Sequence, residues 1–296
     1  MPVMALQHIR RMRGGANAHL LRADDGRYYI VKFRNNPQHE RILVNELISY
    51  VLLHYLRLPA PAWNLVEVRQ DLIDASPEMT MEAGRERRRC EAGLQFGSCF
   101  PGDPARRAVY DYVPASLLRM VFNVDCFCGM LAFDKWVSNA DGRQAIFFRD
   151  RAKEWLAPGG EPTLSPRSLV YVASMIDHGF TFNAQNWDFV DSAEIGLYTR
   201  REVYERVRGE ESFDPWLDRI LHCPAEVLDD AYKRVPPEWF GGDWDRLEAL
   251  LERLYRRRSL VPELLRSAKQ AGRDPFPQWT LAARSTPVGK GGDGGL

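Results

Sequence analysis

The sequence predicts an α+β protein with two lobes, a small antiparallel-sheet N-lobe with one long helix and a mainly helical C-lobe. Short β-forming runs are concentrated in the first hundred residues, and apolar residues at helical spacing dominate the rest. A cluster of Pro, Gly and charged residues at 100–108, FPGDPARRA, separates the two patterns and is the expected hinge. We therefore place the N-lobe at residues 1–105, the C-lobe at 106–274 and a disordered Gly-rich tail at 275–296.

Turn signals and periodicity define the expected N-lobe elements. Residues 20–33 hold two apolar runs around the turn sequence DDG, which is typical of a β-hairpin. Residues 38–57 carry apolar side chains at helical spacing and precede Leu58-Pro59, so we expect a long and mostly buried helix that ends there. The remaining segments are strands at 63–68 and 92–98 and, at 70–89, an irregular stretch with a short helix.

The C-lobe is expected to be built around one buried helix. Residues 117–137 are helical in period and apolar enough to form this central element. Two strands, at 145–148 and 168–177, are expected on either side of a Pro/Gly-rich surface loop. Three further helices are expected at 200–223, 224–234 and 243–270.

Composition and charge exclude several classes of protein. The 296 residues include 40 basic and 40 acidic side chains, so the net charge is zero and a bulk attraction to nucleic acid or membranes is not indicated. The apolar runs are too short for a membrane span, and the first residues lack the features of a secretory signal. Five scattered cysteines favour reduced thiols. We therefore expect a cytoplasmic protein for which a nucleic-acid partner is unlikely.

A strand lysine and a helix glutamate form the first candidate pair for chemistry. Lys32 ends the run YYIVK, where a buried ammonium needs an anionic partner. Glu46 lies on a largely apolar face of the predicted helix, where a carboxylate is rarely left unpaired. An ion pair between them would aim the ammonium at phosphates. The alternative is a lysine whose charged end reaches solvent and a half-exposed glutamate.

A second candidate lies at the end of the last predicted strand, in MIDHGFTF at 175–182. An aspartate at a strand end and close to a glycine, such as Asp177, is well placed to hold a divalent cation at a cleft. The alternative is an Asx turn in which His178 merely packs. Near the N-terminus, the small residues at 13–18, RGGANA, would let backbone amides approach a ligand closely, although Gly14-Gly15 alone is weak evidence.

The segments RGGANAH, YYIVKF, NELISY, FDKWVSNADGR and MIDHG together resemble the HipA-family kinases, specifically the short stand-alone bacterial HipA-like kinase domains. The likeness spans about residues 8–270 and extends more distantly to phosphoinositide and protein kinases. It implies a two-lobed protein-kinase-like fold, ATP with Mg²⁺, and transfer of the γ-phosphoryl group to a hydroxyl, with a protein Ser or Thr as the expected acceptor. The implied nucleotide-binding residues are Gly14, Gly15, Ala16, Asn17, Lys32 and Glu46.

The same resemblance implies that Asp141 accepts the hydroxyl proton and that Asp177 binds Mg²⁺. The family pattern has an asparagine five residues after the catalytic aspartate, but here that position is Ile146. Gln144 and Asn139 are therefore competing candidates for the amide metal ligand.

A second register, with Asp134 as the catalytic residue, is also open because Asp134 and Asn139 are five residues apart. Asp141 is favoured because Asp134 falls within the apolar helix. The altered loop also keeps open a nucleotide-binding pseudokinase or scaffold that transfers no phosphate. A nucleic-acid-binding regulator is a third, weaker reading.

Overall fold

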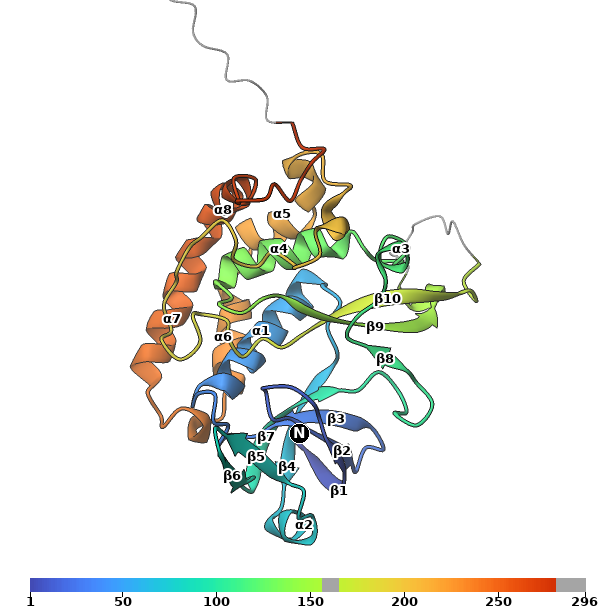
Figure 1. Cartoon of the computed structure of the whole chain (residues 1–296). Coiled ribbons are helices and arrows are strands. Elements are labelled where there is room, and N and C mark those ends of the chain that lie inside the picture. The colour runs from blue at the N-terminus through green and yellow to red at the C-terminus, as the bar shows by residue number, and fades with distance from the viewer. Residues whose placement is uncertain (156–164, 281–296) are drawn as a thin grey trace, which may run out of the picture.

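The computed structural model describes residues 1–155 and 165–280. It confirms the predicted α+β class, because a sheet-rich N-terminal part is followed by a mainly helical C-terminal part (Figure 1). In the described residues no helix combines the length and apolarity needed to cross a membrane.

The N-lobe is built on a closed barrel of five strands in the order β1-β2-β3-β7-β4. These strands are β1 (Val3–Arg11), β2 (His19–Ala23), β3 (Tyr28–Lys32), β4 (Trp63–Val68) and β7 (Gly93–Cys99). Neighbouring strands pair antiparallel except β1 and β4, which are parallel. Alternating side chains such as Leu21, Val31 and Val66 are fully buried inside the barrel, where they form its core.

Two parts of the N-lobe differ from the prediction. β1 was not expected, and the segment predicted to be irregular contains, after the short helix α2 (Gln70–Ala75), a hairpin of β5 (Thr80–Ala83) and β6 (Glu86–Arg89). All four residues of β6 are exposed. Such a strand lacks the alternation of apolar and polar residues by which half-buried strands are found.

Helix α1 (Ile42–Leu56) is the long buried helix predicted for the N-lobe. Thirteen of its 15 residues are buried, including Asn45, Glu46 and Ser49. It contacts β7 of the barrel and helices α5 and α6 of the C-lobe, which explains why it has no solvent-facing stripe (Figure 1). The helix therefore links the two lobes.

The C-lobe helices are shorter than predicted. They are α3 (Ala115–Leu118), α4 (Cys126–Val137), α5 (Trp216–Leu221), α6 (Ala225–Arg234), α7 (Trp244–Arg257) and α8 (Val261–Ala268), with short 3₁₀ turns η1 (Ala152–Glu154), η2 (Arg201–Tyr204), η3 (Glu210–Phe213), η4 (Pro237–Trp239) and η5 (Arg258–Leu260).

Local contacts explain why the longer predicted helices are interrupted. The helix predicted at 117–137 is split because the backbone N–H of Phe122 donates to Tyr171 O (2.8 Å), and the amide of Asn123 pairs with the backbone of Ala173. These bonds cover the free edge of a strand and take 122–123 out of helical geometry. Pro215 lies at the N-cap of α5 and Pro262 in the first turn of α8, and neither can donate the N–H that would continue a preceding helix.

A three-stranded antiparallel sheet in the order β10-β9-β8 completes the C-lobe. Its strands are β8 (Val109–Tyr110), β9 (Gln144–Arg151) and β10 (Leu169–Ile176). Gln144 pairs with Ile176, so the start of β9 and the end of β10 lie side by side. Part of the predicted Pro/Gly-rich loop, 156–164, falls outside the described residues.

The packed chain continues beyond the predicted end of the C-lobe at residue 274. Phe276 and Trp279 are both buried, and their rings pack against Phe213. The start of the predicted tail is therefore corrected to lie after Trp279, and residues 281–296 of that tail fall outside the described residues.

Candidate active site

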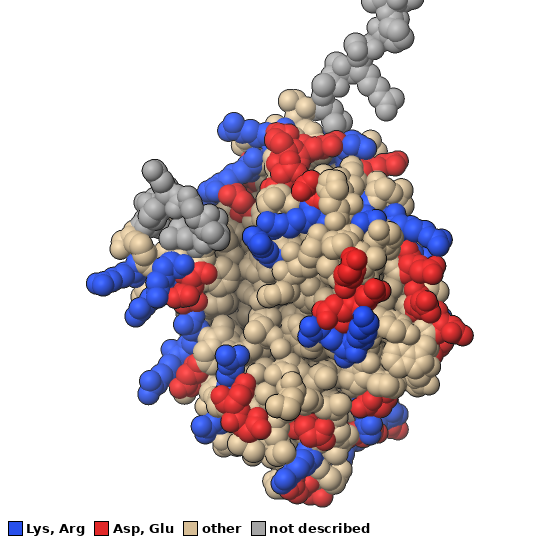
Figure 2. Space-filling model, turned by 180° about the vertical axis from the view of Figure 1, so that it is seen from behind, with Lys and Arg blue, Asp and Glu red and all other residues tan. Residues whose placement is uncertain are grey.

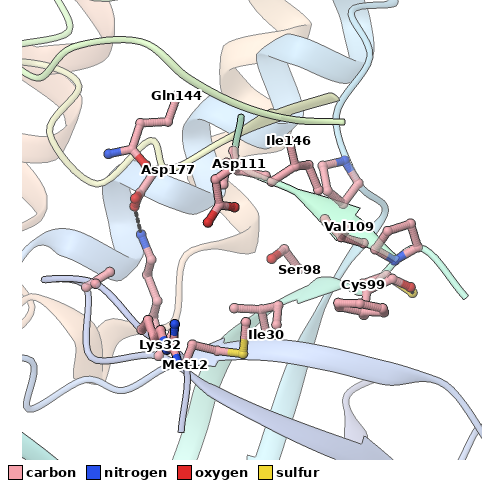
Figure 3. Close-up of a pocket in the computed structure, with 18 of the residues that line it drawn as sticks. Met12, Ile30, Lys32, Ser98, Cys99, Val109, Asp111, Gln144, Ile146 and Asp177 are labelled. Carbon is pink, nitrogen blue, oxygen red and sulfur yellow. Dashed lines mark hydrogen bonds and ion pairs between the residues drawn. The ribbon is translucent and has the colours of Figure 1, made fainter. Parts of the chain in front are cut away.

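A cavity of about 1070 Å³ is lined by residues from both lobes (Figure 3). The N-lobe contributes the loop between β1 and β2 together with β3, α1 and β7, and the C-lobe contributes β8, the start of β9 and the residue after β10. Seven of the predicted site residues line it: Gly14, Gly15, Ala16, Lys32, Glu46, Gln144 and Asp177. Three others, Asn17, Asn139 and Asp141, lie outside its described lining.

Lys32 is the charged centre of the cavity wall. It is the last residue of β3, is 7% exposed, and its Nζ contacts Oε1 of Glu46 and Oδ1 of Asp177. Burial alone would lower the pKa of Lys32, but the two carboxylates outweigh it and raise the pKa. The ammonium therefore stays charged, as a phosphate-binding group must.

The two carboxylates that contact Lys32 differ in environment. Glu46 is 1% exposed, its Oε1 also accepts the N–H of His178 (3.0 Å), and burial raises its pKa. Burial would also raise the pKa of Asp177, but Lys32 outweighs it and lowers the pKa. The Asp177 side chain is 26% exposed and anionic, so it is the carboxylate that a cation could reach.

Helix α1 holds the backbone that carries Asp177. Asp177 follows β10 directly with a φ of 65°, a left-handed conformation that turns the chain sharply. Behind it, Gly179 O accepts hydrogen bonds from the side chains of His39 (2.9 Å) and Asn45 (2.8 Å). His178 is fully buried, with its ring edge-on to Tyr50, and does not line the cavity. Asn45 of α1 and His39, which precedes the helix, thus help to hold the turn that carries Asp177.

The loop between β1 and β2 forms another wall of the cavity. Gly14 has a φ of 109°, and a Cβ built on it would meet nothing within 4 Å among the described residues, so the backbone faces open space. Asn17 has a different place: it is buried, its Nδ2 donates to Glu82 O (3.1 Å), and its Oδ1 accepts from Arg11 (2.8 Å). Asn17 therefore anchors the loop to β5 instead of facing the cavity.

Only one of the two candidate amides lies near Asp177. Gln144 is exposed at the start of β9, lines the cavity and points toward Asp177 in Figure 3. Asn139 is 1% exposed; its Nδ2 donates to Oδ1 of Asp134 (3.1 Å), and its Oδ1 accepts the N–H of Asp141 (3.3 Å). The structure brings Gln144, and not Asn139, to the proposed metal position.

The two aspartates considered for catalysis are also in opposite environments. Asp134 is completely buried in α4, and both of its oxygens accept hydrogen bonds from the guanidinium of Arg143. Asp141 is exposed, and its Oδ1 accepts the N–H of Gly142 (2.7 Å). Of the two carboxylates, only that of Asp141 is accessible to an acceptor hydroxyl.

Two residues at this site were not singled out from the sequence. Asp111 lines the cavity directly after β8, but no motif surrounds it, and only its position after the hinge could have pointed to it (Figure 3). Arg143 lies between Asp141 and Gln144 in the chain but was not among the predicted site residues. Arg143 is 3% exposed, and its side chain contacts that of Asp134, which lies nine residues earlier in the chain. The signal that could have revealed Arg143 is its place in the sequence, between the segment that carries Asp141 and the segment that carries Asp177.

The donor set of the cavity fits Mg²⁺ bound together with phosphates. In the described part of the chain no group of three or more His, Cys, Asp or Glu side chains is placed to hold a metal ion. The Asp177 carboxylate and the Gln144 amide face the same space, and the Asp111 carboxylate lines the same cavity, while Glu46 is occupied by Lys32. Mg²⁺ is usually held by one or two carboxylates, with waters and substrate phosphates completing its octahedron, so a sparse protein donor set is what it needs.

Charges of both signs are interspersed over the face seen in Figure 2, as expected from the equal numbers of basic and acidic residues. The described residues on this face therefore do not form a broad field of one sign, such as a nucleic-acid-binding surface would present.

Comparison with family models agrees with the sequence resemblance. The model of a family described as "HipA-like kinase" matches residues 6–261. No curated protein matches the chain. Two solved structures are similar at 14% identity, each over 90% of this chain: the Golgi casein kinase (74% of that chain, TM-score 0.47) and the Golgi casein kinase with Mn/ADP bound (73% of that chain, TM-score 0.42).

Proposed function

The chain belongs to the HipA-like kinase family, and we propose that it is an ATP- and Mg²⁺-dependent phosphotransferase that moves the γ-phosphoryl group to a hydroxyl. The observation that carries the proposal is the position of Lys32, held between Glu46 and Asp177 at the wall of a cavity that both lobes line. Such an arrangement supplies a fixed cation for phosphates and a carboxylate for a metal ion.

The N-lobe residues would bind and orient the nucleotide. Lys32 would donate to phosphate oxygens, with Glu46 holding its ammonium in place. The open backbone at Gly14 lets phosphates approach main-chain N–H groups without meeting a side chain, whereas at Gly15 the Gln38 side chain lies 3.5 Å from where a Cβ would be. Catalysis of phosphoryl transfer depends mainly on such positioning and on charge stabilisation.

The C-lobe residues would hold the metal ion and the acceptor. Asp177 and Gln144 would provide protein ligands to Mg²⁺, which neutralises charge on the phosphate oxygens when bound. Asp141 would accept the proton of the acceptor hydroxyl. Because Asp141 is exposed and lies outside the described lining of the cavity, a Ser or Thr on the surface of another protein could reach it, and we favour a protein acceptor.

A second candidate function is nucleotide binding without transfer. It is favoured by Ile146, an apolar residue at the position of the family's metal-ligating asparagine, and by the location of Asp141 outside the described cavity lining. In that case Lys32 and Asp177 would still bind a nucleotide, and the chain would act as a pseudokinase or scaffold.

Transfer of label from γ-labelled ATP to protein acceptors, with release of labelled phosphate recorded in parallel, tests the proposal. We expect Asp141→Asn to lower the transfer rate by at least about 100-fold, while nucleotide affinity changes by less than about threefold. Asp245→Asn, an exposed aspartate on α7, is the matched control and should behave like the parent. Nucleotide-induced thermal stabilisation without any transfer by the parent would favour the pseudokinase.

A further inference from the structure

Arg143 contacts the chain on both sides of Asp177. Its side chain is completely buried, and one of its terminal nitrogens donates to Ile176 O (2.9 Å) and lies 3.2 Å from Nδ1 of His178. The other two guanidinium nitrogens donate to Asp134, with Nε lying 2.7 Å from Oδ2. The residue before and the residue after Asp177 are thus tied to the same guanidinium.

The same ion pair also reaches the segment that carries Asp141. Arg143 is two residues beyond Asp141 in the chain, so its burial fixes the end of that loop. Oδ1 of Asp134 accepts the Nδ2 of Asn139 (3.1 Å), and Oδ1 of Asn139 accepts the N–H of Asp141 (3.3 Å). The start of the loop is thereby attached to Asp134 as well.

We propose that the buried Asp134–Arg143 pair is a positioning device that fixes the loop of Asp141 and the turn of Asp177 relative to each other. Neither residue lines the described cavity, so both act through the residues they hold. The inference rests on the proposed phosphotransferase function, which gives Asp141 and Asp177 their roles. The guanidinium suits this task because its planar fork of five donors binds several acceptors in fixed directions, which a lysine ammonium does not do.

The energetics of burial support a role in geometry. A buried ion pair loses its hydration, and well-packed apolar residues of similar size often stabilise a fold as well or better. Arginine keeps its charge in proteins, and the guanidinium of Arg143 donates to both oxygens of Asp134, so the two groups form an ion pair. Stability alone therefore gives little reason for the buried Asp134–Arg143 pair. Its hydrogen bonds to the segments that carry Asp141 and Asp177 suit it to align those segments.

His178 transmits this alignment to the residue next to Asp177. Nδ1 of His178 lies 3.2 Å from the guanidinium of Arg143, and because a guanidinium has only donors, Nδ1 accepts the hydrogen bond. The opposite ring nitrogen, Nε2, is buried without a hydrogen-bond partner in the described residues. Arg143 is thus the polar partner that orients this ring.

The test compares Arg143→Lys with Arg257→Lys. Arg257 is a suitable control because its guanidinium is also buried in the C-lobe, where it pairs with Asp191 and donates to Lys135 O and Trp136 O of α4 rather than to Asp134, Ile176 or His178. For Arg143→Lys we expect kcat to fall roughly 10- to 100-fold and the Mg²⁺ concentration for half-saturation to rise by a similar factor. Nucleotide affinity without Mg²⁺ should change less than about threefold.

Hydrogen exchange gives a readout that needs neither nucleotide nor metal. The amide of His178 should exchange faster in Arg143→Lys than in the parent, and Arg257→Lys should leave it unchanged. Equal effects of the two variants on kcat, on Mg²⁺ half-saturation and on this amide would overturn the positioning role.

The outcomes also separate this inference from the proposed function. One outcome is that the parent transfers no phosphate, but Mg²⁺ tightens its binding of nucleotide and does not do so in Arg143→Lys. The proposed phosphotransferase function would then be wrong, while the positioning role of Arg143 would stand. If Arg143→Lys does not fold, Asp134→Asn is the second variant, since it keeps an acceptor for Arg143; it should raise the Mg²⁺ requirement at least about threefold. Failure of both variants to fold would assign the pair to stability alone.

Discussion

The Nζ atom of Lys32 contacts Oδ1 of Asp177, although 145 residues separate the two in the sequence. The contact joins the last residue of a barrel strand in the N-lobe to the turn after the last sheet strand of the C-lobe (Figure 3). Because the same carboxylate is the proposed metal ligand, binding of a nucleotide to Lys32 and of Mg²⁺ to Asp177 should be thermodynamically linked.

Replacement of Lys32 by methionine tests the charge balance of this site. In Lys32→Met, Glu46 and Asp177 lose their buried counter-charge, and we expect the free energy of unfolding near neutral pH to fall by about 3–5 kcal/mol. Without Lys32 the folded-state pKa of both carboxyls would lie above the unfolded value. The variant should therefore lose stability as the pH rises through that pKa. Urea denaturation at pH 5 and pH 7.5 measures this, with exposed Lys233→Met as the control. A pH-independent loss would contradict the account.

Alanine substitution separates the two candidate catalytic aspartates by their effect on stability. Asp134→Ala leaves the buried guanidinium of Arg143 unpaired, and we expect a loss of about 3–5 kcal/mol. Asp141→Ala removes an exposed side chain and should change stability by less than about 0.5 kcal/mol while abolishing transfer. Denaturation curves and transfer rates of both variants check this. A stable Asp134→Ala protein that no longer transfers phosphate, together with an Asp141→Ala protein that still does, would instead support the register with Asp134 as the catalytic residue.

The two candidate amide ligands should respond differently to removal. Gln144→Ala should raise the Mg²⁺ concentration for half-saturation by roughly 10-fold at nearly unchanged stability, since its side chain is exposed at the cavity. Asn139→Ala should cost about 1–3 kcal/mol of stability, because buried partners on Asp134 and Asp141 lose their hydrogen bonds. Magnesium titrations paired with thermal unfolding distinguish them. The reverse pattern would return the ligand role to Asn139.

These contrasts show where sequence patterns reach their limit. Lys32, Glu46 and Asp177 could be placed at one site because each is a charged residue on an apolar strand or helix and so needs a partner. The choice between Asn139 and Gln144 could not be made from spacing. It depends on the pairing of β9 with β10, which sets Gln144 beside Ile176 and is a tertiary contact.

The same limit applies to the elements of the fold. The hairpin of β2 and β3 can be predicted from its turn sequence. The exposed strand β6 cannot be predicted in this way, because its residues do not alternate between apolar and polar. The predicted helix at 117–137 has the right periodicity, but Phe122 bonds to the edge of β10 and interrupts it. A competing long-range hydrogen bond of this kind leaves no local pattern in the sequence.

Buried histidines in the barrel predict a pH dependence of stability. Burial, with a smaller effect of His8, lowers the pKa of His19 to about 4, and its ring nitrogens contact His8 (3.0 Å) and Thr80 O (3.2 Å). Because the folded pKa lies below the unfolded value of 6.5, stability present above pH 6.5 is lost as the pH falls. We expect His19 to account for about 2 kcal/mol of the loss between pH 7 and pH 5.

The comparison of His19→Gln with His222→Gln checks this expectation. His222 is exposed, so its replacement should leave the pH dependence of unfolding as in the parent. The slope of unfolding free energy against pH should be shallower in His19→Gln. An unchanged slope in that variant would show that His19 does not contribute to acid sensitivity.

The most direct test of the proposed phosphotransferase is the rate of γ-phosphoryl transfer from ATP during a Mg²⁺ titration, measured for the parent and for Asp177→Asn. The account predicts saturable, Mg²⁺-dependent transfer by the parent. In Asp177→Asn it predicts a rate at least about 100-fold lower, which rises only at much higher Mg²⁺, because the anionic ligand is lost. Transfer by Asp177→Asn at the parental rate and with the parental Mg²⁺ dependence would contradict it.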